Sequence, residues 1–105
     1  MSDYALTPFA KADVFQIWCY IAGQSEEAAN RVEQAIYDAC AFIADAPSHG
    51  HARSQVTSRR LLFWALTRYP NYTVVYRPET DPLQVVAVLK RNIRGLLRQR
   101  SGPQA

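Results

Sequence analysis

The carboxy-terminal segment of this chain concentrates positive charge. Residues 90–105 contain five cations and no acid, namely Lys90, Arg91, Arg94, Arg98 and Arg100. They directly follow the apolar run "VVAVL" at 85–89. Basic side chains without neighbouring acids are suited to binding phosphate oxygens, and this attraction is strong and insensitive to nucleotide sequence. We therefore predict that these five residues contact a polyanionic target or an acidic protein segment. The simpler alternative is a solvated tail.

Cations in the second half of the chain also raise the question of RNA cleavage. Attack by a 2′-hydroxyl needs a base for its proton, an acid for the leaving oxygen and cations for the phosphate. Cations are plentiful, but no Asp or Glu lies between Asp45 and Glu79. Lys90 is the only lysine in this half and would have to act as the base. A nuclease interpretation would therefore use Arg60, Arg77 and Lys90, and otherwise we predict no catalytic residue.

The histidines and cysteines indicate neither a metal site nor a disulfide. His49 and His51 lie in a polar stretch without a nearby carboxylate or thiolate, which makes a poor metal site. Cys19 and Cys40 fall on two helices that we expect to be antiparallel. In that hairpin they are offset by about 16 Å along the axis, whereas a disulfide spans about 7 Å at most. We predict two buried free thiols, no metal and no cofactor.

Length and charge distribution limit the class of protein. The chain has 105 residues, which suits a single domain over 1–105. Its net charge of +3 divides into −5 for residues 1–50, with two cations and seven acids, and +8 for residues 51–105, with ten cations and two acids. No apolar run approaches the roughly 18 residues of a membrane span, and the amino terminus does not resemble a signal peptide. We predict a cytoplasmic protein that does not bind membranes.

The hydrophobic pattern predicts two helices after a short strand at 3–7. Thr7 can cap the first helix, Pro8 suits its first position and Gly23 ends it. One face of this helix should be buried, formed by Ala10, Val14, Ile17, Trp18 and Ile21. The second helix covers 25–47, from the cap Ser25 to Pro47. Its predicted buried stripe consists of Ala28, Val32, Ala35, Ile36, Ala39, Ile43 and Ala46.

The rest of the chain predicts a small sheet. A polar loop at 47–58 precedes a strand at 59–69, in which side chains alternate, and two further strands at 72–77 and 83–90. Short turns connect the three strands into an antiparallel meander. The resulting order β-α-α-β-β-β is an α+β fold with two layers, in which a helical hairpin covers one face of the sheet. The segment 91–97 also allows a short helical turn, although Gly95 disfavours it.

The first helix is apolar on its other side as well. Phe9, Ala12, Phe15, Cys19 and Tyr20 lie there. A helix that is apolar nearly all round is either buried on several sides or exposes a binding surface. Burial on every side is difficult in a chain of this size, so we predict a partner surface on this helix.

Several segments together resemble the RelE/ParE toxins of type II toxin–antitoxin systems, and the ParE branch most closely. The segments are "YALTPFAKADVFQIWCYIA", "RVEQAIYDACAFIADAPSHG", "RLLFWAL", "YTVVYRPE" and "VVAVLKRNIRGLL". They cover nearly the whole chain in the order found in the family. One departure is the pair Lys90 and Arg91, where many members carry His-Gly.

The resemblance implies a growth-inhibiting toxin that a cognate ParD-like antitoxin neutralises. For the ParE branch it implies inhibition of DNA gyrase, and for the RelE branch cleavage of mRNA on the ribosome. The tyrosine or histidine that nucleases of the RelE branch carry near the carboxy terminus is absent, because no Tyr or His follows Tyr76. We therefore expect a gyrase inhibitor. The alternatives are a ribosome-dependent endonuclease and an inactive relative that acts only as a binding module.

These expectations assign roles to particular residues. The antitoxin should bind Phe9, Phe15, Cys19 and Tyr20 on the first helix. Gyrase, and DNA phosphates within the gyrase complex, should contact the basic segment of Lys90, Arg91, Arg94, Arg98 and Arg100.

Overall fold

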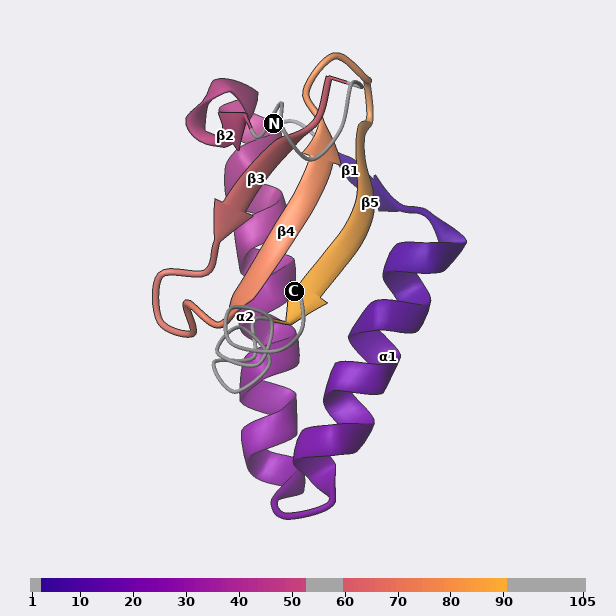
Figure 1. The fold of residues 1–105 in the computed structure, drawn as a ribbon, viewed down its shortest axis with the longest axis vertical. Coiled ribbons are helices and arrows are strands. Elements are labelled where there is room, and N and C mark those ends of the chain that lie inside the picture. The colour runs from indigo at the N-terminus through magenta and orange to yellow at the C-terminus, as the bar shows by residue number, and fades with distance from the viewer. Residues whose placement is uncertain (1–2, 53–59, 91–105) are drawn as a thin grey trace, which may run out of the picture.

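The computed structural model describes residues 3–52 and 60–90 as two helices and one mixed sheet (Figure 1). The elements in chain order are β1 (Tyr4–Leu6), α1 (Pro8–Ala22), α2 (Glu26–Asp45), the 3₁₀ turn η1 (Pro47–His49), β2 (His51–Ala52), β3 (Leu62–Ala65), β4 (Tyr72–Arg77) and β5 (Leu83–Lys90). The predicted α+β class is confirmed. The short strand β2 was not predicted, and β3 is shorter than the expected 59–69.

The helices begin where the sequence predicts, because hydroxyl side chains satisfy their free N–H groups. Thr7 Oγ1 accepts a hydrogen bond from the N–H of Ala10 at 3.2 Å, and Ser25 Oγ accepts one from Ala28 at 3.1 Å. Across the hairpin, Trp18 Nε1 donates to Asn30 Oδ1 at 2.8 Å. This bond fixes the register of α1 against α2.

The buried face of α1 agrees with the prediction except at Trp18 and Ile21, which are only half-buried, and the buried face of α2 is rotated. Ala10, Val14 and Ile17 are buried in α1. In α2 the buried residues are Ala29, Val32, Ile36, Cys40, Ile43 and Ala44. The predicted positions Ala28, Ala35, Ala39 and Ala46 are only half-buried. The buried face of α2 therefore lies slightly to one side of the predicted face, because both the sheet and α1 pack against this helix.

The sheet has the order β1-β5-β4-β3-β2. The predicted antiparallel meander of β3, β4 and β5 is confirmed, and β1 adds to β5 in parallel. A register shift follows Val75, so that Val74 faces Val88 while Tyr76 faces Val85. α2 crosses behind the sheet and α1 runs beside β5 (Figure 1). The largest fully buried side chains come from both layers: Tyr76, Ile36, Ile43, Val74, Val85 and Cys40.

Both cysteines are free, as predicted, but only Cys40 is buried; Cys19 is exposed because it lies on the side of α1 opposite the core. The expected helical turn at 91–97 lies outside the described residues. Within 3–52 and 60–90, neither helix combines the length and apolarity that a membrane crossing requires.

Candidate functional site

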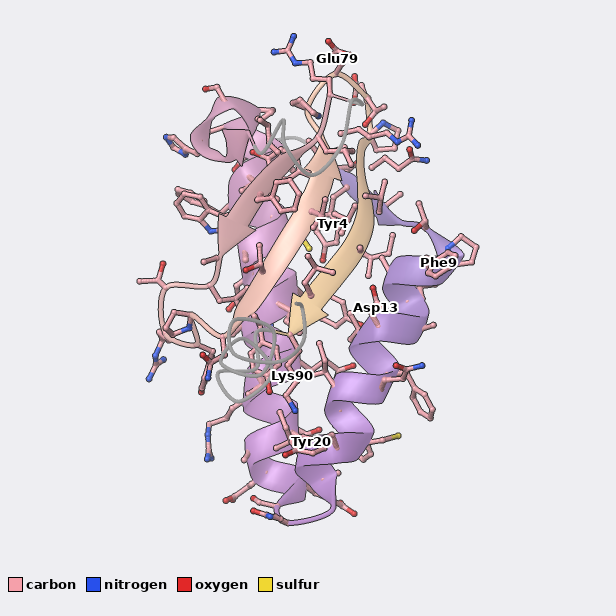
Figure 2. The ribbon with its side chains drawn as sticks, in the orientation of Figure 1. Tyr4, Phe9, Asp13, Tyr20, Glu79 and Lys90 are labelled. Carbon is pink, nitrogen blue, oxygen red and sulfur yellow. The ribbon has the colours of Figure 1, made fainter. Side chains whose placement is uncertain are left out.

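An apolar stripe runs along the outer side of α1. It consists of Phe9, Ala12, Phe15 and Cys19, whose spacing places them on one helical face. All four are exposed, Phe9 by 78% and Phe15 by 66%. Phe9 points away from the sheet (Figure 2). We call this set the α1 stripe. Large apolar side chains gathered on one exposed face are typical of an interaction surface.

The inner side of α1 is held to the edge of β5. β1 pairs with β5 only as far as Val85, which leaves the rest of that edge without a strand among the described residues. Thr7 Oγ1 donates to the carbonyl of Val86 at 3.2 Å, and Asp13 Oδ2 accepts from the N–H of Val88 at 3.0 Å. Thr7 and Asp13 thereby satisfy backbone groups of β5 that another strand could otherwise pair with.

Lys90 is positioned at the end of β5 by an aromatic ring. Its ammonium nitrogen lies 3.3 Å from the centroid of the Tyr20 ring, and Figure 2 shows the two side chains together below Asp13. A cation above an aromatic face is attracted by the electrons of the ring. Tyr20 remains 70% exposed, so this pair lies at the surface. The other predicted target-binding residues, Arg91, Arg94, Arg98 and Arg100, lie outside the described residues.

The three residues of the nuclease interpretation do not form one site. Arg77 pairs with Gln84 at one end of β4, and Tyr72 pairs with Lys90 at the other end. Along β4, Tyr72 and Arg77 are five residue steps apart, which is about 17 Å. Arg60 lies at the Arg77 end, where its guanidinium contacts the Glu79 carboxylate at 3.1 Å. Lys90 is therefore remote from the two arginines.

His49 packs against aromatic rings. Its ring stacks on Phe42 with centroids 5.1 Å apart and lies 6.0 Å from the Trp64 ring. Within the described part of the chain, no three His, Cys, Asp or Glu side chains gather into a possible metal site.

A groove between α2 and β3 was not predicted from the sequence. Its volume is about 420 Å³, which is within the usual range of binding clefts. Arg31, Ala35, Ala39 and Phe42 contribute from α2, and Trp64 and Arg68 from β3 and the following loop. We call it the α2–β3 groove. No local motif marks it, because its two walls meet only through tertiary packing.

Comparison with known families identifies the chain. Residues 4–94 match the model of a family described as the ParE toxin of type II toxin–antitoxin system, parDE. This chain belongs to the ParE toxin family. The resemblance seen in the sequence is thus confirmed over nearly the whole length of this family member.

A solved structure described as the chromosomal ParDE TA system from P. aeruginosa has a similar fold to this ParE-family chain. The TM-score is 0.68 at 18% identity, and the match covers 88% of this chain and 98% of the other. At this identity the likeness shows the shared fold alone. A comparison with curated proteins found no match.

Proposed function

We propose that this ParE-family toxin inhibits DNA gyrase and is neutralised by a ParD-like antitoxin encoded beside it. The observation that carries the proposal is the family match over residues 4–94. A gyrase inhibitor of this kind needs surfaces that bind the target and the antitoxin, and it needs no catalytic residue of its own.

The α1 stripe and the neighbouring Tyr20 are the proposed antitoxin surface. Phe9, Phe15, Cys19 and Tyr20 are all exposed, whereas the opposite side of α1 is buried. Segments that fold on binding commonly lay apolar side chains on such a helix face. An antitoxin segment that covers this stripe would remove large apolar side chains from water, which favours association.

The basic end of the chain is the proposed target surface. Lys90 is exposed at the end of β5, and the cations Arg91, Arg94, Arg98 and Arg100 follow it in sequence. Gyrase holds DNA, and cations contacting DNA phosphates add affinity that depends on salt rather than on nucleotide sequence. These residues would hold the toxin against the gyrase–DNA complex.

The geometry disfavours the mRNA endonuclease alternative. A base and the phosphate-binding cations must reach one scissile phosphate together. Lys90 instead lies about 17 Å along the sheet from Arg77, with its ammonium over the Tyr20 ring.

Expression in bacterial cells tests the proposal. Inducing the chain alone should stop growth and relax a reporter plasmid, because gyrase maintains negative supercoiling; topoisomer gels measure this. Co-expression of the adjoining reading frame should restore both growth and supercoiling. Growth arrest with normal supercoiling and newly cleaved mRNA would instead support the endonuclease alternative.

A further inference from the structure

We infer that the α2–β3 groove binds an extended, acidic segment of the antitoxin, at a site separate from the α1 stripe. The inference rests on the proposed function, because it assumes an antitoxin partner. It adds a second contact surface and states the chemistry of the segment that fits there.

The dimensions of the groove suit a short extended peptide. Its α2 wall reaches from Arg31 to Phe42, eleven residues or about 16 Å along the helix. Ala35 and Ala39 line the same wall, and their small side chains leave room for an incoming backbone. An extended chain covers this length with about five residues.

One end of the groove is aromatic. Phe42 is 47% exposed, and its ring lies 5.3 Å from that of Trp64. His49 stacks on Phe42 and also lies 6.0 Å from the Trp64 ring, so the three rings form one cluster. A fixed, partly exposed aromatic surface suits an apolar anchor residue of a partner.

The other end is cationic. Arg31 contacts Glu27 only at 3.9 Å, with side chains 63% and 90% exposed, so this ion pair is weak. Arg68 is exposed and has no ion-pair partner among residues 3–52 and 60–90. The one acid lining the groove, Asp38, accepts a hydrogen bond from Gln34 at 2.9 Å. Two available guanidinium groups therefore favour a carboxylate on the partner.

The sheet edge beside the groove is open. β2 pairs only with Leu62 and Phe63, so no described strand lies beside Ala65, which is exposed. The N–H of Leu66 donates to the carbonyl of Tyr72, and by the alternation of an antiparallel pair the backbone groups of Ala65 face outward. An extended segment can bind such an edge through its backbone.

The groove and the α1 stripe cannot be covered by one compact contact. The groove lies beside β3, whereas α1 runs along β5, and β4 separates these strands (Figure 1). Substitutions in the groove should therefore weaken antitoxin binding without altering the α1 stripe.

Two groove variants test the inference, with the purified product of the adjoining reading frame as the probe in titration calorimetry. Ala39→Trp fills the groove and should lower affinity by about tenfold or more. Arg31→Gln with Arg68→Gln should lower affinity several-fold and make it less dependent on salt. The control Gln24→Glu with Ser48→Asp changes the net charge equally, at exposed positions outside the groove, and should bind as the wild type does.

The outcomes separate the inference from the proposed function. Wild-type affinity in both folded groove variants, together with lost affinity in Phe15→Glu, would overturn the groove inference alone. Failure of the wild-type chain to bind the probe would overturn both. If Ala39→Trp does not fold, the arginine pair decides, because both side chains are exposed. Sedimentation that shows self-association through the groove would assign it to a second copy and overturn the inference.

Discussion

The hydroxyl of Tyr76 ties the turn after α2 to the centre of the sheet. It accepts a hydrogen bond from the N–H of Gly50 at 2.9 Å and donates one to the carbonyl of Pro47 at 2.5 Å. Burial raises the pKa of this phenol, and the hydrogen bond from Gly50 partly opposes the rise. One side chain thus satisfies two backbone groups that β2 and η1 leave unpaired.

Gly50 is required by this close approach. A Cβ atom at this position would collide with the Tyr76 hydroxyl and lie 2.9 Å from Leu62 Cβ. We expect Gly50→Ala to reduce the free energy of unfolding by about 1–3 kcal/mol, measured by urea denaturation. Gly23→Ala is the matched control, since its Cβ would meet only two backbone oxygens, at 3.5 and 3.9 Å. Equal effects of the two substitutions would contradict this explanation.

Cys40 makes stability depend on alkaline pH. Burial raises the pKa of its thiol from 9.0 to about 12. Between about pH 9 and pH 12 the thiol therefore keeps its proton in the folded state and loses it in the unfolded chain. The contribution of Cys40 to the free energy of unfolding is complete below about pH 9 and declines as the pH rises toward 12. Through this thiol, the free energy of unfolding should fall by at most about 1.4 kcal/mol per pH unit.

Urea denaturation of the wild type and Cys40→Ala across this pH range checks the prediction. The substituted chain should lose the part of the pH dependence that Cys40 causes. Burial also raises the pKa of Tyr72 and Tyr76, which adds a pH dependence of the same sign in both proteins. Alkylation offers a second test: iodoacetamide should label exposed Cys19 in the native chain and Cys40 only in denaturant. Identical pH dependence in both proteins would show that the thiol does not contribute.

At the scale of elements, α1 has three separate faces. One is buried through Ala10, Val14 and Ile17, one caps the edge of β5 through Asp13, and one presents the α1 stripe to solvent. Its apolar residues are spread around the helix because both the core and the proposed partner use them.

Phe15→Glu tests the third face. Phe15 is 66% exposed, so the substitution should leave the unfolding transition nearly unchanged. It should weaken neutralisation by the antitoxin several-fold or more, measured as growth rescue and by titration calorimetry, because a charge replaces an apolar contact. Gln24→Glu adds the same charge at an exposed site off the stripe and serves as the control. Unfolding of Phe15→Glu would mean that Phe15 belongs to the core.

The sequence predicts those elements whose signals are local. Thr7, Pro8 and Ser25 mark helix starts, and the turn signals at 70–71 and 78–82 mark the limits of β4 and β5. The predicted helix starts and strand bounds therefore agree with the structure. β2 has only two residues and is defined by its pairing with Leu62 and Phe63, so no sequence pattern indicates it. The burial of Ala29 and Ala44 in place of the predicted Ala28 and Ala46 likewise depends on tertiary packing against α2.

The sequence also predicts one part of the candidate sites, whereas only the structure shows the rest. Exposure of Phe9 and Phe15 was predictable, because a small domain cannot bury both sides of α1. The contact of Lys90 with Tyr20 and the α2–β3 groove were not, because each brings together residues far apart in the sequence. The separation of Lys90 from Arg77 follows from the predicted hairpin of 72–77 and 83–90, which places these two residues at opposite ends.

At the scale of the whole molecule, charge is unevenly distributed along the chain, with −5 before residue 51 and +8 from there on. We predict that replacing Arg94, Arg98 and Arg100 by Gln weakens gyrase inhibition. Three lost phosphate contacts should flatten the dependence of log affinity on log salt by about 0.9 per contact. The matched Lys substitutions keep the charge and should keep the salt dependence. Unaltered inhibition by the Gln variant at every salt concentration would contradict a role for these residues.

A gyrase assay with purified components tests directly whether this ParE-family chain inhibits gyrase. The chain, added to gyrase, ATP and relaxed plasmid, should block supercoiling and accumulate linear DNA once detergent and protease are added. Prior addition of the antitoxin should abolish both effects, and ribosome-bound mRNA incubated with the chain should remain intact. Normal supercoiling by gyrase, combined with ribosome-dependent mRNA cuts that disappear in Lys90→Ala, would show that the chain is an endonuclease and not a gyrase inhibitor.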